Sequence, residues 1–204
     1  MVARRKSSSS KSGALHLKIE LLDIEPSIWR RIVVPDSLSL LELHAVIQGA
    51  MGWRDCHLHL FEIGDRRFEV PEDGQSEPEE GCEDERRYRL KAVLGKTSEF
   101  FYTYDFGDDW RHRVSIEADV PPIPERYLPF CVGGERACPP EDCGGAYSYP
   151  DFLDALAGPG HSEHQAMREW APGFEAEAFN VTQANALIQL VCALYRERGW
   201  GFDD

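Results

Sequence analysis

Three of the six cysteines lie close together, at positions 131, 138 and 143, in the segment CVGGERACPPEDCGG. Three thiolates suit zinc, and an imidazole from His161 or His164 would complete a tetrahedral set of ligands. The spacing C-x6-C-x4-C lacks the C-x2-C pair of common zinc fingers. The alternative is that Cys138 and Cys143 are small buried thiols in a loop of glycines and prolines. Zinc held by Cys131, Cys138, Cys143 and one of these histidines is therefore one hypothesis.

Carboxylates form a second group of chemistry-bearing residues, in YDFGDDWRH at residues 104–112 and in PPEDCGG at residues 139–145. Crowded carboxylates bind cations or act as acid and base. Aspartate is also a routine turn residue, because its side chain accepts hydrogen bonds from nearby backbone N–H groups. The two stretches together predict a binding surface made of Tyr104, Asp105, Asp108, Asp109, Trp110, His112, Glu141 and Asp142.

Two further histidine pairs have spacings that could do chemistry. His57 and His59 alternate in a predicted strand, so they share one face, which we expect to point to solvent rather than to act in catalysis. His161 and His164 are three residues apart and can share a helical face. That second pair could bind metal or relay protons, and an exposed structural role is the alternative.

The elements that must position these residues begin with two strands. Residues 15–21 alternate strictly between apolar and polar, which predicts a half-buried strand. Residues 28–34 resume a β-rich composition, so we expect the two strands to pair antiparallel. Ser39 and Glu42 then form a capping box, and apolar residues recur at helical spacing until Gly52. The pattern predicts a helix that packs on the strand pair.

Further strands follow at residues 58–63 and 67–70. Two aromatic and β-branched runs between Glu99 and Val120 flank Gly107, Asp108 and Asp109, which predicts a hairpin. Three helical patterns come after the cysteine segment, with expected starts at Phe152, Ser162 and Thr182. The last of them carries a regular apolar stripe and ends at Gly199. Strands followed by helices indicate an α+β fold with an antiparallel or mixed sheet, a packed helix in the N-terminal half and a C-terminal group of three helices.

The composition of the chain changes along its length and indicates how it is divided. Residues 1–13 are basic and serine-rich, which predicts a disordered tail, and residues 14–198 are expected to form a single domain. Within it we expect an acidic loop at 71–87, a Cys/Pro/Gly loop at 121–149 and a helical part at 150–198.

Charge and hydropathy narrow the function classes. The chain has 204 residues and a formal net charge of −14, so we expect its acidic body to repel phosphate backbones and not to bind nucleic acid. Its apolar runs are too short to cross a bilayer, and the basic N-terminus is not followed by an apolar stretch. We therefore expect a cytoplasmic protein without a membrane partner, in which the cysteines stay reduced or bind metal.

Four stretches carry a resemblance to a known family: IWRRIVVP at 28–35, YDFGDDWRH at 104–112, CPPEDCGG at 138–145 and HSEHQAMREW at 161–170. Together they resemble the plasmid pRiA4b open-reading-frame-three-like family, over roughly residues 14–190. The resemblance implies an α+β domain often carried on plasmid or mobile DNA, and some relatives bear a transposon resolvase label. This chain lacks the activated serine among arginines and the basic DNA-reading module that a serine recombinase needs.

Three function classes remain open. The first is a non-enzymatic interaction module associated with plasmid or mobile-element genes, which offers the aromatic hairpin and the PPEDCGG loop to a protein partner. The second is a metal-dependent, zinc hydrolase-like enzyme built from the cysteine loop, His161, His164 and nearby acids. The third is an accessory factor in DNA transposition or recombination. Because no complete catalytic constellation is evident, we expect the first, with no cofactor beyond a possible zinc ion.

Overall fold

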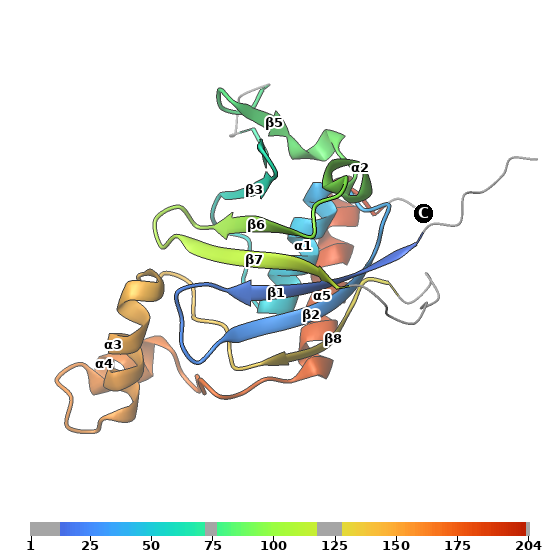
Figure 1. Ribbon diagram of the computed structural model, residues 1–204. Helices are drawn as coiled ribbons and strands as arrows, with labels where there is room; N and C mark the ends of the chain where they lie inside the picture. The colour runs from blue at the N-terminus through green and yellow to red at the C-terminus, as the bar shows by residue number, and fades with distance from the viewer. Residues whose placement is uncertain (1–12, 72–76, 118–127, 203–204) are drawn as a thin grey trace, which may run out of the picture.

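One mixed sheet with helices on one face and at one end makes up the structure, a computed structural model that describes residues 13–71, 77–117 and 128–202. The strands are β1 (Ala14–Leu21), β2 (Ile28–Pro35), β3 (His59–Ile63), β4 (Arg66–Glu69), β5 (Cys82–Asp84), β6 (Glu99–Tyr104), β7 (Trp110–Glu117) and β8 (Phe130–Glu135). The helices are α1 (Leu40–Met51), η1 (Glu85–Arg87), α2 (Leu90–Leu94), α3 (Gly145–Ala157), α4 (His164–Trp170) and α5 (Val181–Glu197). The predicted α+β class is confirmed (Figure 1).

The strands are ordered β5-β4-β3-β6-β7-β1-β2-β8, and all neighbours are antiparallel except β4 and β5. The predicted pairing of β1 with β2 is present, with Leu17 opposite Ile32. On the apolar face of β1, Leu17, Ile19 and Leu21 are buried as expected and Leu15 is half-buried, whereas His16 on the opposite face is also buried. Each such apolar side chain contributes about 1.5–3 kcal/mol to stability when it is fully removed from water.

Helix α1 connects β2 to the segment of residues 52–58 that precedes β3. Its predicted capping box is present: Glu42 N donates to the Ser39 side chain, and Ser39 N donates to the Glu42 carboxylate. The helix ends at Gly52, whose φ of 96° is the left-handed conformation that glycine adopts without strain. Figure 1 shows α1 and α5 side by side against one face of the sheet. At Gly49 a Cβ would lie 2.6 Å from the Ile188 Cα, so glycine permits this close approach.

The hairpin of β6 and β7 has the predicted faces. Phe100, Tyr102 and Tyr104 are buried on β6, and Trp110 and Val114 are buried on β7. The turn that joins the strands closes with a hydrogen bond of 2.7 Å from Asp109 N to Asp105 O.

The two predicted loops contain regular structure that their composition did not indicate. The acidic segment 71–87, of which residues 72–76 lie outside the described part, includes β5 and η1. The segment 121–149, described from residue 128, includes β8 and the start of α3. Both are edge strands stabilised by pairing with β4 and β2, which lie outside the two segments, and this is why the composition of the segments misses them.

The helix starts also differ from those expected. Helix α3 begins at Gly145 rather than Phe152 and includes Pro150. Helix α4 begins at His164 without a side-chain cap, and α5 is capped by Asn180, whose side chain accepts hydrogen bonds from Thr182 N and Gln183 N. The short helix α2 was not predicted.

Of the predicted tail 1–13, only Gly13 lies within the described residues. Beyond the expected boundary at 198, Phe202 is buried, and its backbone N–H donates to the Glu42 carboxylate on α1. Among the described residues, none of the helices combines the length and the apolar character that crossing a bilayer requires.

Candidate functional site

The two stretches singled out in the sequence meet in space. The turn between β6 and β7 lies against the start of α3, where Gly144 N donates to Asp108 Oδ2 at 3.1 Å. At Gly145, which has a φ of 76°, a Cβ would lie only 2.3 Å from the Asp108 carbonyl oxygen. Only glycine fits such a contact at this backbone conformation. The acids of YDFGDDW and PPEDCGG therefore face one site.

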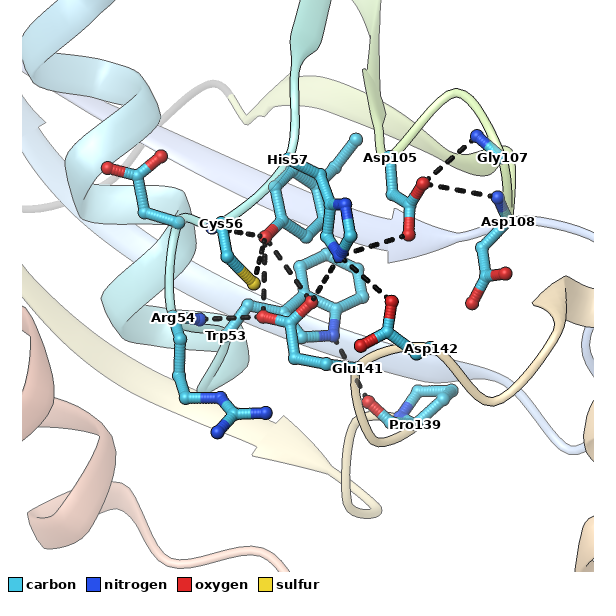
Figure 2. Close-up of polar contacts among 12 residues, drawn as sticks. Trp53, Arg54, Cys56, His57, Asp105, Gly107, Asp108, Pro139, Glu141 and Asp142 are labelled. Carbon is cyan, nitrogen blue, oxygen red and sulfur yellow. Dashed lines mark hydrogen bonds and ion pairs between the residues drawn. The ribbon is translucent and has the colours of Figure 1, made fainter.

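His57 is the centre of this site (Figure 2). Its Nε2 atom lies 3.1 Å from Asp142 Oδ1, 3.5 Å from Asp105 Oδ2 and 3.8 Å from Glu141 Oε2. The nitrogen is buried, yet none of these contacts has the geometry of a hydrogen bond. Buried polar atoms are nearly always hydrogen-bonded, so such an atom calls for an explanation.

Asp105 is held so that one oxygen serves the turn and the other faces His57. Its Oδ1 accepts hydrogen bonds from Gly107 N at 2.9 Å and Asp108 N at 3.3 Å. Its backbone N–H donates to Leu58 O at 2.9 Å, which fixes the hairpin beside the residue that follows His57. Oδ2 is thereby left to point at the imidazole.

Glu141 and Tyr104 form the inner wall of the site. Glu141 is buried, and its Oε1 accepts a hydrogen bond of 2.7 Å from Arg54 N. The Tyr104 hydroxyl donates to the same carboxylate at 3.3 Å and accepts from Cys56 N at 3.1 Å. Burial, reinforced by the Glu141 charge, raises the pKa of Tyr104 well above its usual value, so the phenol stays protonated and acts as a donor.

The arrangement suits a metal ion better than nucleophilic chemistry. Ligand atoms of His57, Asp105 and Asp142 lie within 4.8 Å of one another, as do those of Cys56, His57 and Glu141. Burial raises the pKa of Cys56, which keeps this thiol protonated and a poor nucleophile near neutral pH. One imidazole nitrogen and several carboxylate oxygens are ligands of Zn²⁺, Mn²⁺ and Fe²⁺ in proteins.

The predicted binding surface divides into two groups. Tyr104, Asp105, Glu141 and Asp142 meet at the site, and Asp108 holds its rim. Trp110 and His112 do not belong to a surface, because both are buried in the core beneath the hairpin. Asp109 is exposed in the turn. Trp110 and His112 alternate along β7, a pattern that indicates a buried face as well as it indicates a binding face. In the structure this face of the sheet is buried.

The predicted zinc ligands do not converge. Among the described residues, neither metal-ligand grouping includes Cys131, Cys138, Cys143, His161 or His164. The cysteines carry protonated thiols: burial raises the pKa of all three, that of Cys143 to about 12. Both histidines are engaged locally, since His164 Nδ1 lies 2.8 Å from Ala155 O and His161 Nδ1 accepts from Glu163 N.

His57 was missed because its neighbourhood was assigned to a strand. Strand β3 begins at His59, so His57 belongs to the preceding segment and turns towards the acids. His59, expected to be solvent-facing, is buried and stacks on His44 with ring centroids 3.5 Å apart. The available signal was the run of polar residues Arg54 to His57 directly after a helix that ends at glycine.

Comparisons with known proteins find relatives along most of the chain. The family model described as plasmid pRiA4b ORF-3-like protein matches residues 13–183. The uncharacterized protein y4hQ of Sinorhizobium fredii (strain NBRC 101917 / NGR234) is 35% identical over 191 residues, covering 92% of this chain and 96% of its own length. The crystal structure of MM3350, a protein of unknown function from Methanosarcina mazei Go1, aligns with a TM-score of 0.75 and 33% identity. That alignment covers 84% of this chain and 97% of the other.

Proposed function

The chain belongs to the plasmid pRiA4b ORF-3-like protein family, and from that premise and the geometry of the site we propose that it is a divalent-metal-binding protein. The ligands are His57, Asp105 and Asp142, with Glu141 beside them. The observation that carries the proposal is the buried His57 Nε2 atom, which faces three carboxylates without a hydrogen bond to any of them.

Electrostatics supports a cation at this position. Three carboxylates approach one imidazole nitrogen in a protein whose formal net charge is already −14. Carboxylates at such short range repel one another unless a proton or a cation lies between them. A metal ion removes this repulsion and accepts the lone pair of Nε2. An imidazole with a proton on Nε2 would instead be expected to donate a hydrogen bond to one of the carboxylates.

The donor set favours a transition metal. An imidazole favours Zn²⁺, Fe²⁺ or Mn²⁺ over Mg²⁺ and Ca²⁺, which prefer oxygen ligands alone. Three protein ligands are the number typical of catalytic zinc sites, which keep a coordination position for water. If the protein is an enzyme, it is accordingly a metal-dependent hydrolase. Glu141, whose Oε2 lies 3.8 Å from His57 Nε2, is then the carboxylate beside the three ligands.

Elemental analysis of purified protein, followed by calorimetric titration with Zn²⁺ and Mn²⁺, tests the proposal. We expect one equivalent of metal per chain. Asp142→Asn should weaken binding by at least ten-fold, since it removes the charge of a ligand whose side chain is 66% exposed and has little structural role.

Asp109→Asn is the matched control, because it makes the same change of charge in the β6–β7 turn next to the site without touching the ligand set. Cys143→Ser and His164→Gln distinguish this site from the zinc set expected from the sequence, and both should retain full affinity. Stoichiometric metal that survives His57→Gln but not Cys143→Ser would overturn the assignment.

An interaction module is the second candidate, and exposed apolar side chains near the site favour it. Leu58 is 48% exposed, Phe106 50% and Tyr147 92%. The backbone bond from Asp105 to Leu58 and the contact of Gly145 with Asp108 bring the segments that carry them together. Photo-crosslinking from position 147 in host cells should give protein adducts that Phe106→Ser abolishes, and adducts unaffected by that change would argue against this surface.

The third class, an accessory factor in DNA transposition or recombination, is the least favoured by charge. A strongly acidic body repels the phosphate backbone, and the described site is itself acidic. A mobility shift of duplex DNA at low salt would support this class, and its absence there would count strongly against it.

A further inference from the structure

A closed ring of buried hydrogen bonds is attached to the segment that carries His57. Gln48 Nε2 donates to the Tyr102 hydroxyl at 3.1 Å, and this hydroxyl lies 2.8 Å from His44 Nδ1. His44 Nε2 lies 2.8 Å from Asp55 Oδ1, and Asp55 N donates to Gln48 Oε1 at 2.9 Å. We call these four residues the polar ring. Tyr195 on α5 joins it by donating to Asp55 Oδ2 at 2.7 Å.

One assignment of protons satisfies every member of the polar ring. With its proton on Nε2, His44 donates to Asp55 and accepts at Nδ1 from Tyr102, whose oxygen accepts from Gln48. His44, Gln48 and Tyr102 are fully buried, so a broken ring would leave a polar atom without water or another partner. The ring therefore holds its members in a single arrangement.

Groups on other elements enclose the ring and keep His44 neutral. His59 on β3 stacks on the His44 ring at an interplanar angle of 10°, and His59 Nε2 lies 2.9 Å from Glu85 Oε2 on η1. Burial lowers the pKa of His44, and His59 adds to this effect, while Asp55 and Glu85 act in the opposite direction. Neutral His44 matches the tautomer that closes the ring.

Asp55 is the point at which the polar ring meets the site. It has a φ of 55° and stands two residues before His57. Its neighbours in the chain are bound to the site itself: Trp53 Nε1 donates to Pro139 O at 3.1 Å and Arg54 N donates to Glu141 at 2.7 Å. In the described residues, the hydrogen bonds that involve a side chain and tie this segment back to α1 and α5 are those of Asp55.

We propose that the polar ring and Tyr195 are positioning groups for the metal site, because they fix Asp55 and thereby the orientation of His57 towards Asp105 and Asp142. The proposal rests on the metal-binding function proposed above and assigns part of that function to α5, a helix that supplies no ligand. Since coupling between two sites is reciprocal, bound metal in turn strengthens the docking of Tyr195 on Asp55.

Tyr195→Phe tests this coupling by removing a single hydroxyl. We expect the affinity for Zn²⁺ to fall by up to roughly five-fold, the change that follows when the free energy of about one ordinary hydrogen bond is fully coupled to metal binding. In metal-free protein, the side-chain NMR resonances of His57 should shift and broaden. Tyr88→Phe is the matched control, because it removes another tyrosine-to-carboxylate hydrogen bond, from Tyr88 to Glu83, at β5. It should leave both the affinity and the His57 resonances unchanged.

The outcomes separate the two proposals. If wild-type protein binds no Zn²⁺ but Tyr195→Phe moves the His57 resonances, the metal function fails and the positioning role stands. If Tyr195→Phe binds Zn²⁺ as tightly as wild type and leaves His57 unmoved, the positioning role is overturned. Should Tyr195→Phe not fold, Asp55→Asn gives the same test, since asparagine tolerates the positive φ and removes the charge that receives both hydrogen bonds.

Discussion

Aspartate is frequent around the site because it serves two purposes there. Asp55, Asp105, Asp109 and Asp142 all have φ between 52° and 59°, a left-handed conformation that aspartate adopts more readily than most residues. From the sequence, the aspartates of the hairpin turn could either accept backbone hydrogen bonds within the turn or bind a cation. At Asp105 both apply, since Oδ1 accepts from the turn and Oδ2 faces His57.

The buried His112 should make the stability of the fold sensitive to acid. Burial lowers its pKa to about 4, whereas the unfolded residue has a pKa near 6.5. Because the unfolded chain binds the proton more readily, the contribution of His112 is complete above about pH 6.5 and is lost as the pH falls towards 4. The loss reaches about 3 kcal/mol.

Urea denaturation between pH 4 and 8 measures this effect. His112→Gln keeps a donor for the Tyr102 carbonyl, which His112 Nδ1 contacts at 3.1 Å, and removes the titrating group. We expect the variant to show a shallower fall of unfolding free energy with acid. An unchanged pH dependence would mean that other groups, such as His44, account for the loss.

At the scale of elements, the site depends on the contact between the β6–β7 turn and the first turn of α3. Helix α3 begins directly after the loop that supplies Glu141 and Asp142, and the contact has no room for a side chain at Gly145. The glycines of PPEDCGG, first considered as loop formers around cysteines, are therefore what lets that loop reach the hairpin.

Gly145→Ala should separate these two elements. The Cβ would meet the Asp108 carbonyl at a φ of 76°, so we expect a loss of about 1–3 kcal/mol of stability and a weaker metal affinity. Thermal unfolding and calorimetry measure the two effects. Gly160→Ala is the control, because no atom lies within 4 Å of the added Cβ there. Equal behaviour of the two variants would contradict the importance of the contact.

At the scale of the whole molecule, three segments far apart in sequence converge: 53–57 after α1, 104–109 from the end of β6 through the turn to β7, and 139–145 up to the start of α3. All three reach the site because the sheet order places β3 beside β6 and because α3 and α4 lie at one end of the sheet (Figure 1). The result concentrates negative charge in a chain that is already acidic.

Metal should consequently stabilise the entire fold. A ligand at 100 times its dissociation constant adds about 2.7 kcal/mol to the free energy of unfolding. For a chain of 204 residues this corresponds to a rise of roughly 5–10 °C in Tm. Differential scanning calorimetry with Zn²⁺, and again after chelation, measures the change. Asp142→Asn should show little rise, and an equal rise in that variant would point to metal bound elsewhere.

The sequence alone determined whatever depends on neighbours along the chain. The alternation in β1, the Ser39 capping box and the aromatic hairpin follow local rules and appear in the structure as expected. The family match over residues 13–183 likewise agrees with the resemblance that YDFGDDWRH and CPPEDCGG carry in the sequence.

Tertiary structure alone decided which of the candidate residues meet. Strand β8 at the start of the cysteine segment exists through its pairing with β2, a partner about a hundred residues away, and it directs Cys131 into the core. His57, with no motif of its own, reaches the acids because Asp55 is fixed by α1 and α5. Such contacts depend on packing between segments that are distant in the chain. No local sequence pattern indicates them, because neither segment alone determines its partner.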